Sequence, residues 1–251
     1  HNDSAGSEDH TDRELTRVLG KAGHHVTSVV SRLNDLTRAL QEIPCDLVVV
    51  AGGDGTVGRA ACELAGWHVP LSILPFGTAN NTAHALELPL RPKQLAKSWH
   101  AAVPVPFDLG IFSDGKLRSR FAEAVGWGVF AEAIVQAKRQ EPAEGVLRTL
   151  RRDRKIFRRV AERLPVRHYE IEVDGRDCSG DYLLVEAMNV GYLGPRLELS
   201  PASDPGDGQL ELLLLGEAER PALVEASKSG KVAADVWQAL ATPGSCDDVV
   251  D

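Results

Sequence analysis

Hydrophobic and polar positions in the first part of the chain alternate between two patterns. Residues 46–51 and 71–74 are short apolar runs, typical of parallel strands buried on both faces, and residues 25–30 read as another strand. Helical spacing of apolar positions predicts helices over residues 15–22, 33–40, 57–64 and 78–86. Strands that alternate with helices in this way predict an open parallel α/β sheet.

The pattern changes at about residue 104. Further strands are expected over residues 105–110, 120–124, 169–173, 181–190 and 210–215, without helices between most of them. Asp174-Gly175 predicts a tight hairpin turn, and residues 138–163 predict one long helix. We therefore expect an N-terminal α/β nucleotide-binding domain over residues 1–104. A second, β-rich and sandwich-like domain is expected over residues 105–251, with an inserted basic helix and an atypical or truncated C-terminus.

Composition narrows the class of protein. The chain is 43% hydrophobic and 25% charged, which is ordinary for a folded globular protein, and its net charge of −8 argues against nucleic acid as a partner. No apolar run approaches the roughly 20 residues of a membrane-spanning helix. The chain opens on polar residues without a secretory signal or an initiator Met, and we expect a first strand to be missing. Its four cysteines lie far apart and are expected to be reduced thiols of a cytoplasmic protein.

A glycine-rich turn, Gly52-Gly53-Asp54-Gly55-Thr56, follows the first buried strand and precedes a helix. Helix starts carry unpaired N–H groups, and glycines let a phosphate come close to them. A simple tight turn would explain one or two glycines but not three with an acid and a hydroxyl. The spacing Gly53-x-Gly55-x-x-Gly58 also matches a dinucleotide fingerprint, but no ribose-binding acid follows the next strand. An acid inside the loop instead favours Mg²⁺ and phosphoryl transfer.

Five segments in order along the chain resemble the diacylglycerol kinase catalytic-domain family. They are Asn2–Gly6, Gly52–Thr56, Leu74–Asn81, Phe107–Gly110 and Asp204–Leu210. The family includes bacterial lipid kinases and sphingosine kinases and is distantly akin to NAD kinases. The match covers residues 2–225.

The resemblance implies a site between the two domains, with ATP as co-substrate and Mg²⁺ as cofactor. The implied nucleotide contacts are Asn2, Gly52, Gly53, Gly55, Thr56, Gly77, Thr78 and Asn80. Asp54 would hold Mg²⁺ or accept the proton of the substrate hydroxyl, and Asp108 would complete the catalytic network. Asp204, Asp207 and Gln209 match a structural Mg²⁺ site, the outer two through backbone carbonyls. The plainer alternatives are a helix cap for Thr78, a capped strand end for Asp108 and an acidic surface loop for the last three residues.

The chain also departs from the family pattern. Asp3 replaces a proline, Asn81 stands where many relatives have Asp, and Gly58-Arg59 replaces Asn-Glu. The closing strand with its D-G-E acid, the proposed proton acceptor, is not recognisable. A nucleotide-binding but catalytically impaired relative is therefore the first alternative function, and a dinucleotide-dependent oxidoreductase is the second.

The predicted long helix is strongly basic. Residues 138–163 hold ten Lys or Arg residues against four acids, although the whole chain is acidic. A basic amphipathic helix can approach anionic lipid, while the plainer alternative is a solvated helix face. The sequence therefore predicts an ATP- and Mg²⁺-dependent kinase that transfers the γ-phosphate to a lipid hydroxyl, of diacylglycerol or a similar lipid. We expect it to be peripheral to the membrane, and a homodimer is compatible with the sequence.

Overall fold

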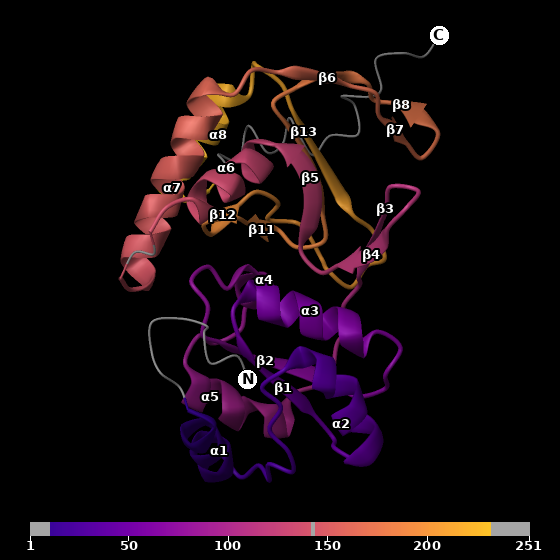
Figure 1. The fold of residues 1–251 in the computed structure, drawn as a ribbon, viewed down its shortest axis with the longest axis vertical. Coiled ribbons are helices and arrows are strands. Elements are labelled where there is room, and N and C mark those ends of the chain that lie inside the picture. The colour runs from indigo at the N-terminus through magenta and orange to yellow at the C-terminus, as the bar shows by residue number, and fades with distance from the viewer. Residues whose placement is uncertain (1–10, 142–143, 232–251) are drawn as a thin grey trace.

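The computed structural model describes residues 11–141 and 144–231, arranged as two parts stacked along the long axis (Figure 1). The N-terminal part holds two of the three strands that the sequence predicts, with flanking helices. Its elements are α1 (Asp12–Lys21), η1 (Leu33–Asp35), α2 (Leu36–Glu42), β1 (Val48–Gly52), α3 (Asp54–Leu64), β2 (Leu71–Pro75), α4 (Asn81–Ala85), α5 (Pro92–Ser98) and η2 (Trp99–Ala101).

Strands β1 and β2 pair in parallel and in register from Val48–Leu71 to Gly52–Pro75. Their apolar side chains pack on α2 and α3 on one side and on α1 and α5 on the other, in two separate clusters. Because the two strands end at the same level, the loops that follow them emerge side by side. The parallel register of β1 and β2 therefore places the glycine turn of residues 52–56 next to the motif of residues 74–81.

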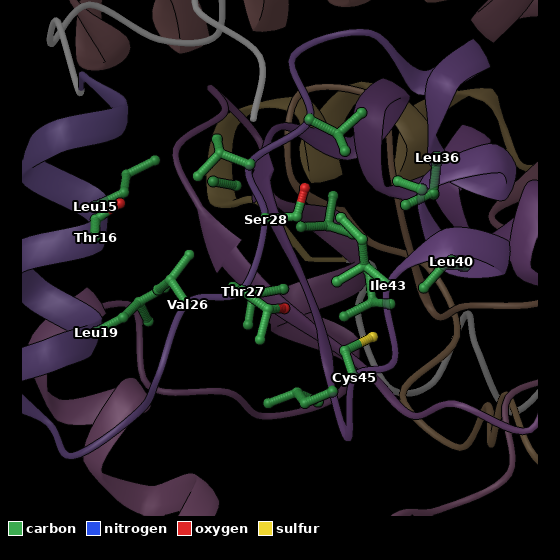
Figure 2. A pocket seen from close by; sticks show the side chains of 18 of the residues that line it. Leu15, Thr16, Leu19, Val26, Thr27, Ser28, Leu36, Leu40, Ile43 and Cys45 are labelled. Atoms are coloured by element: carbon green, nitrogen blue, oxygen red, sulfur yellow. The ribbon is translucent and has the colours of Figure 1, made fainter.

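The prediction of a strand over residues 25–30 is wrong. This segment belongs to none of the described strands, and β1 has β2 as its one described neighbour. A cavity of about 980 Å³ lies between the segment and β1, lined by apolar side chains such as Val26, Leu40 and Ile43 (Figure 2).

The C-terminal part is β-rich, as predicted. Its elements are β3 (Gly110–Ser113), β4 (Arg118–Phe121), β5 (Ala124–Gly128), α6 (Val129–Lys138), α7 (Val146–Arg163), β6 (Arg167–Tyr169), β7 (Glu172–Val173), β8 (Arg176–Asp177), β9 (Gly180–Tyr182), β10 (Leu184–Met188), β11 (Tyr192–Leu193), β12 (Leu197–Glu198), β13 (Glu211–Leu215) and α8 (Arg220–Ser229). Among them, β13, β10 and β5 form an antiparallel sheet, and α6, α7 and α8 pack against its apolar face.

Several local predictions for this part need correction. Residues 105–109 form no strand, since β3 begins at Gly110. The helix predicted over residues 138–163 is α7, which begins only at Val146 after Gly145 at φ +82°, while Lys138 is the last residue of a separate helix, α6. The hairpin prediction is confirmed: Asp174 and Gly175 have φ of +51° and +81° and join the paired strands β7 and β8. Cys45 and Cys62 are free thiols, but Cys178 is disulfide-bonded, so the expectation of four reduced thiols is wrong there.

Glu186 is a carboxylic acid in the core of the C-terminal sheet. It is 6% exposed at the centre of β10, opposite Gly126 of β5, whose missing side chain leaves room for the carboxyl group. Burial raises the pKa of Glu186 to about 8, so the folded protein keeps this group protonated at neutral pH.

We predict that Glu186→Gln removes a pH dependence of stability. Between about pH 4.5 and 8 the unfolded chain loses this proton while the folded chain keeps it, so the free energy of unfolding falls as pH rises. The variant should be more stable than wild type at pH 8, by a few kcal/mol at about 1.4 kcal/mol per pKa unit. Urea unfolding across this pH range measures the difference. Glu42→Gln on the exposed end of α2 is the control, and equal slopes for wild type and Glu186→Gln would contradict the prediction.

Candidate functional site

Two glycine-containing loops touch at the carboxyl ends of β1 and β2. The Phe76 N–H donates to the Gly52 carbonyl at 3.0 Å, and a Cβ on Gly53 would lie 2.9 Å from the Cα of Gly77. A Cβ on Gly52 would likewise lie 2.8 Å from the Cβ of buried Thr56. Glycine is therefore required at these positions because the neighbouring atoms leave no room for a side chain, and not only because of the turn conformation.

Asn80 closes the second loop on itself. It adopts the left-handed conformation with φ +54°, and its side-chain oxygen accepts from the Gly77 N–H at 2.8 Å while its amide donates to the Gly77 carbonyl at 2.9 Å. Both ends of the side chain are thus engaged within the loop. In the described part of the chain, the backbone N–H groups of Thr78, Ala79 and Asn80 have no partner, so the loop offers three free donors.

Asp54 begins α3 and links the two loops. Its Oδ1 accepts from the Thr82 N–H in the first turn of α4 at 3.2 Å. The Thr82 hydroxyl in turn donates to Glu123 Oε1 at 3.3 Å. The carboxyl groups of Asp54 and Glu123 also hydrogen-bond to each other, and burial, followed by the charge of Asp54, holds the pKa of Glu123 well above its usual range. The arrangement places two carboxyl groups beside the free amides.

Sequence reasoning missed Glu123. It lies in the bend between β4 and β5, and the buried Asn189 fixes its backbone by donating an N–H to the Glu123 carbonyl at 2.7 Å. The side chain of Asn189 donates to the carbonyls of Asp108 and Ala122 at 2.9 and 3.0 Å. The sequence does show that Glu123 is an acid within an otherwise apolar run. That pattern alone does not reveal that its carboxyl group meets Asp54.

Asp108 contacts the acidic loop through its backbone and its side chain. Its N–H donates to the Pro205 carbonyl at 2.6 Å, and its Oδ2 accepts from the Gly208 N–H at 2.7 Å. In the same loop Asp204 accepts from Gly206, and Asp207 accepts from the Gln209 N–H at 2.9 Å. The structure thus gathers Asp108 with the 204–209 loop, and the roles of these residues stay predictions. Asn2 lies outside the described residues.

The oxygen atoms of the central site suit a magnesium ion whose coordination shell is completed by phosphate oxygens and water. Across residues 11–141 and 144–231, no three His, Cys, Asp or Glu side chains group closely enough to hold a metal by themselves. Asp54 offers a carboxylate at a phosphate-binding type of loop, and Mg²⁺ typically takes one or two carboxylates and completes its shell with phosphate and water. The residues therefore fit such an ion only together with a bound nucleotide.

Comparisons with known proteins agree with this geometry. Residues 1–112 match the family described as the diacylglycerol kinase catalytic domain. The chain is 28% identical to a diacylglycerol kinase of Bacillus subtilis, over 82% of this chain and 69% of that protein. It is 30% identical to a "probable lipid kinase YegS-like" protein of Serratia proteamaculans, over 72% of this chain and 60% of that protein. A crystal structure of a diacylglycerol kinase from Bacillus anthracis superposes with a TM-score of 0.61 at 23% identity, covering 90% of this chain and 75% of the other.

The α/β fold with its two touching glycine loops is the fold of that solved structure. Residues 1–112 match the diacylglycerol kinase catalytic domain, the family that the motifs predicted, and the relatives named above are a diacylglycerol kinase and a probable lipid kinase. The chain spans 69% and 60% of the length of these two relatives.

We predict that the loop contact tolerates no side chain at Gly77. Gly77→Ala would place a Cβ against the Gly53 backbone and lower the free energy of unfolding by about 1–3 kcal/mol. Gly55→Ala is the matched control, because a Cβ there meets no atom within 4 Å and the residue lies in α3, so stability should hold or rise by about 0.4–1 kcal/mol. Urea unfolding of both variants measures this, and similar losses would contradict the steric account.

Proposed function

We propose that this protein transfers the γ-phosphate of ATP to the hydroxyl of a lipid alcohol, diacylglycerol or a similar lipid, with Mg²⁺ as cofactor. The observation that carries the proposal is the set of three free amides in the loop 78–80, which precedes the helix whose Thr82 N–H binds the Asp54 carboxylate, where the two strand ends touch. Free amides and helix starts bind phosphate, and a carboxylate beside them requires a cation.

Each residue has a distinct part in this proposal. Gly52, Gly53 and Gly55 leave the backbone open to the phosphates, Gly77 keeps the loops in contact, and Thr56 and Thr78 add hydroxyl groups. These groups fix the phosphates for in-line attack, which is the main requirement of phosphoryl transfer. Bound Mg²⁺ would neutralise charge on the phosphate oxygens, with Asp54 as its protein ligand.

The substrate hydroxyl needs a proton acceptor, and we assign this role to Asp54. Burial raises the pKa of Glu123, which favours its protonated form, and a protonated Glu123 donates a hydrogen bond that orients the Asp54 carboxylate. Asp108 would act at a distance from this point, by holding the loop of Asp204, Asp207 and Gln209, where we propose a structural Mg²⁺. We place the division between the two domains in the strandless stretch 102–109.

An impaired relative that binds ATP without transferring phosphate is the second candidate. It is motivated by the missing closing acid of the family, and the tail acids Asp247 and Asp248 lie outside the described residues. Nothing favours the dinucleotide oxidoreductase, because β2 ends in Pro75-Phe76-Gly77 without an acid to hold a ribose.

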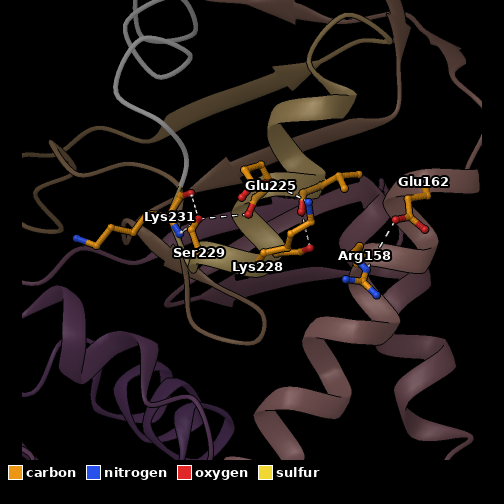
Figure 3. Close-up of polar contacts among 8 residues, drawn as sticks. Arg158, Glu162, Glu225, Lys228, Ser229 and Lys231 are labelled. Atoms are coloured by element: carbon orange, nitrogen blue, oxygen red, sulfur yellow. Dashed lines mark hydrogen bonds and ion pairs between the residues drawn. The ribbon is translucent and has the colours of Figure 1, made fainter.

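The basic helix α7 can meet a membrane through charge alone. Leu150, Phe157 and Val160 of its apolar stripe are buried in the core, while Leu147 at its start is 68% exposed. Among the cations, Arg158 pairs with Glu162 at 3.7 Å, near the Lys228–Glu225 pair of α8 (Figure 3). Exposed cations follow one face of the helix: Arg148, Arg151, Lys155 and Arg159. Within the described residues, no helix is both long and apolar enough to cross a bilayer.

We predict that Asp54→Asn abolishes lipid phosphorylation while the fold remains intact. The variant keeps the shape of the side chain but loses the charge and the proton acceptor, and removal of one such group typically costs about 10² to 10³ in rate. Labelled phosphate transfer measures the loss. Asp46→Asn, the same change at the opposite end of β1, should leave the rate unchanged, and near-wild-type turnover of Asp54→Asn would contradict the assignment.

We also predict salt-dependent binding to anionic vesicles through the exposed face of α7. Changing Arg148, Arg151, Lys155 and Arg159 together to Gln should weaken binding by more than about tenfold, because each cation near such a surface contributes about 1 kcal/mol. Co-sedimentation at low and high salt measures the effect. The control changes four exposed cations of the N-terminal part: Arg13, Arg17, Lys93 and Lys97. If both variants lost vesicle binding equally, the effect would come from net charge in general and the prediction for α7 would be contradicted.

A further inference from the structure

Arg196 of the C-terminal part reaches the second glycine loop of the N-terminal part. It lies in the turn between β11 and β12 with φ +59°, and its Nε and Nη2 donate to the carbonyls of Ala79 and Thr78 at 2.9 and 3.0 Å. Two parallel hydrogen bonds from one guanidinium fix both distance and orientation. The residue therefore joins the two parts at the loop that carries the free amides.

A second arginine holds the first one in place. Arg154 of α7 donates from Nε to the Pro195 carbonyl at 3.1 Å and from Nη2 to the Arg196 carbonyl at 3.0 Å. Gly230, the C-cap of α8, closes over this guanidinium, because a Cβ there would lie 2.8 Å from Arg154 Nη2. A continuous chain of contacts thus runs from the basic helix to the loop 78–80.

Peptide geometry gives this contact a consequence for the free amides. In a trans peptide the C=O and N–H bonds point in opposite directions. Arg196 holds the carbonyls of Thr78 and Ala79 on its own side, so the N–H groups of Ala79 and Asn80 are directed to the other side. These N–H groups are two of the three free donors of the loop within the described residues.

The charged groups around the Arg196 guanidinium are Arg154 and Asp54. Burial and the neighbouring charge of Arg154 lower the pKa of Arg196, and the charge of Asp54 opposes them. Arg196 therefore lies within electrostatic range of the carboxylate that we assign to the cation and the substrate hydroxyl. A guanidinium also polarises the peptides that it binds, which strengthens their N–H groups as donors.

We propose that Arg196, held by Arg154, is a positioning residue that orients the backbone amides of Ala79 and Asn80 toward the nucleotide phosphates. This inference rests on the proposed function, because it assumes that the loop binds the phosphates of ATP. The alternative is a purely structural contact between the two parts of the chain. Loss of such a contact would lower the affinity for every ligand and the stability of the fold together.

The test compares ligands with and without phosphates. Affinities for Mg²⁺-ATP and for adenosine are measured by calorimetry and competition for wild type, Arg196→Gln, Arg196→Lys and Arg154→Gln. Arg151→Gln, on the exposed face of the same helix, is the control. Amide resonances of Ala79 and Asn80 are followed in parallel on addition of Mg²⁺-ATP, and thermal unfolding reports whether each variant is folded.

We expect Arg196→Gln to lose about tenfold or more in affinity for ATP, the effect of one lost charge-assisted hydrogen bond, with adenosine affinity within about twofold of wild type. Arg196→Lys should recover part of the loss, and Arg154→Gln should show a smaller loss with the same selectivity. The ATP-induced shifts of the two amides should shrink in Arg196→Gln and persist in Arg151→Gln. If Arg196→Gln fails to fold, Arg196→Lys and Arg154→Gln carry the same comparison.

Two results would overturn the inference. Unchanged ATP affinity in Arg196→Gln, or equal losses of affinity for ATP and adenosine across the variants, would mean that Arg196 has only a structural role. A wild-type protein that binds ATP no better than adenosine would instead contradict the proposed function, and the two failures are therefore distinguishable.

Discussion

The contact between the backbones of Gly53 and Gly77 is the constraint on which the site depends. Parallel register ends β1 and β2 at one level, and the absence of side chains at these positions lets the two loops touch. Next to this contact, the start of α3, with Asp54, lies against the first turn of α4. The amides of Thr78, Ala79 and Asn80 in the second loop are unpaired in the described chain.

The C-terminal part completes the site instead of merely adjoining it. Glu123 extends from a bend of this part to the Asp54 carboxyl group, and Asn81 donates across the boundary to the Gly194 carbonyl at 3.1 Å. Asn81 thus serves the contact between the two parts, in a position where a carboxylate would face a carbonyl oxygen with no hydrogen to donate. The departure from the family pattern at this position therefore has a structural reason in this chain.

Much of the fold could be predicted from the sequence because local signals agree with the final structure. The buried runs of β1 and β2, the helix α3 after the glycine turn, and the hairpin at Asp174-Gly175 are examples. The failures concern long-range pairing. Residues 25–30 have strand-like composition but belong to none of the described strands, and the helix predicted over residues 138–163 begins only at Val146, after Gly145 with its positive φ.

The candidate site divides in the same way. Motifs revealed the glycine loops and Asp54, since their spacing is local. Glu123 and Arg196 could not be found, because each acts on a residue 41 or more positions away and neither lies in a recognisable motif. The catalytic role of Asp108 stays a prediction, and its carboxylate accepts from the Gly208 N–H on the acidic loop, 100 residues away in the sequence. Only tertiary structure could show that contact.

The central claim is transfer of the γ-phosphate from ATP to a lipid hydroxyl at the loops of Gly53 and Gly77. Its most direct test is incubation of the protein with γ-labelled ATP, Mg²⁺ and mixed micelles that contain one lipid alcohol at a time, diacylglycerol and a sphingoid base among them. The account predicts label in at least one lipid, dependent on Mg²⁺. Measurable ATP affinity without label in any lipid would contradict it and would favour the impaired relative.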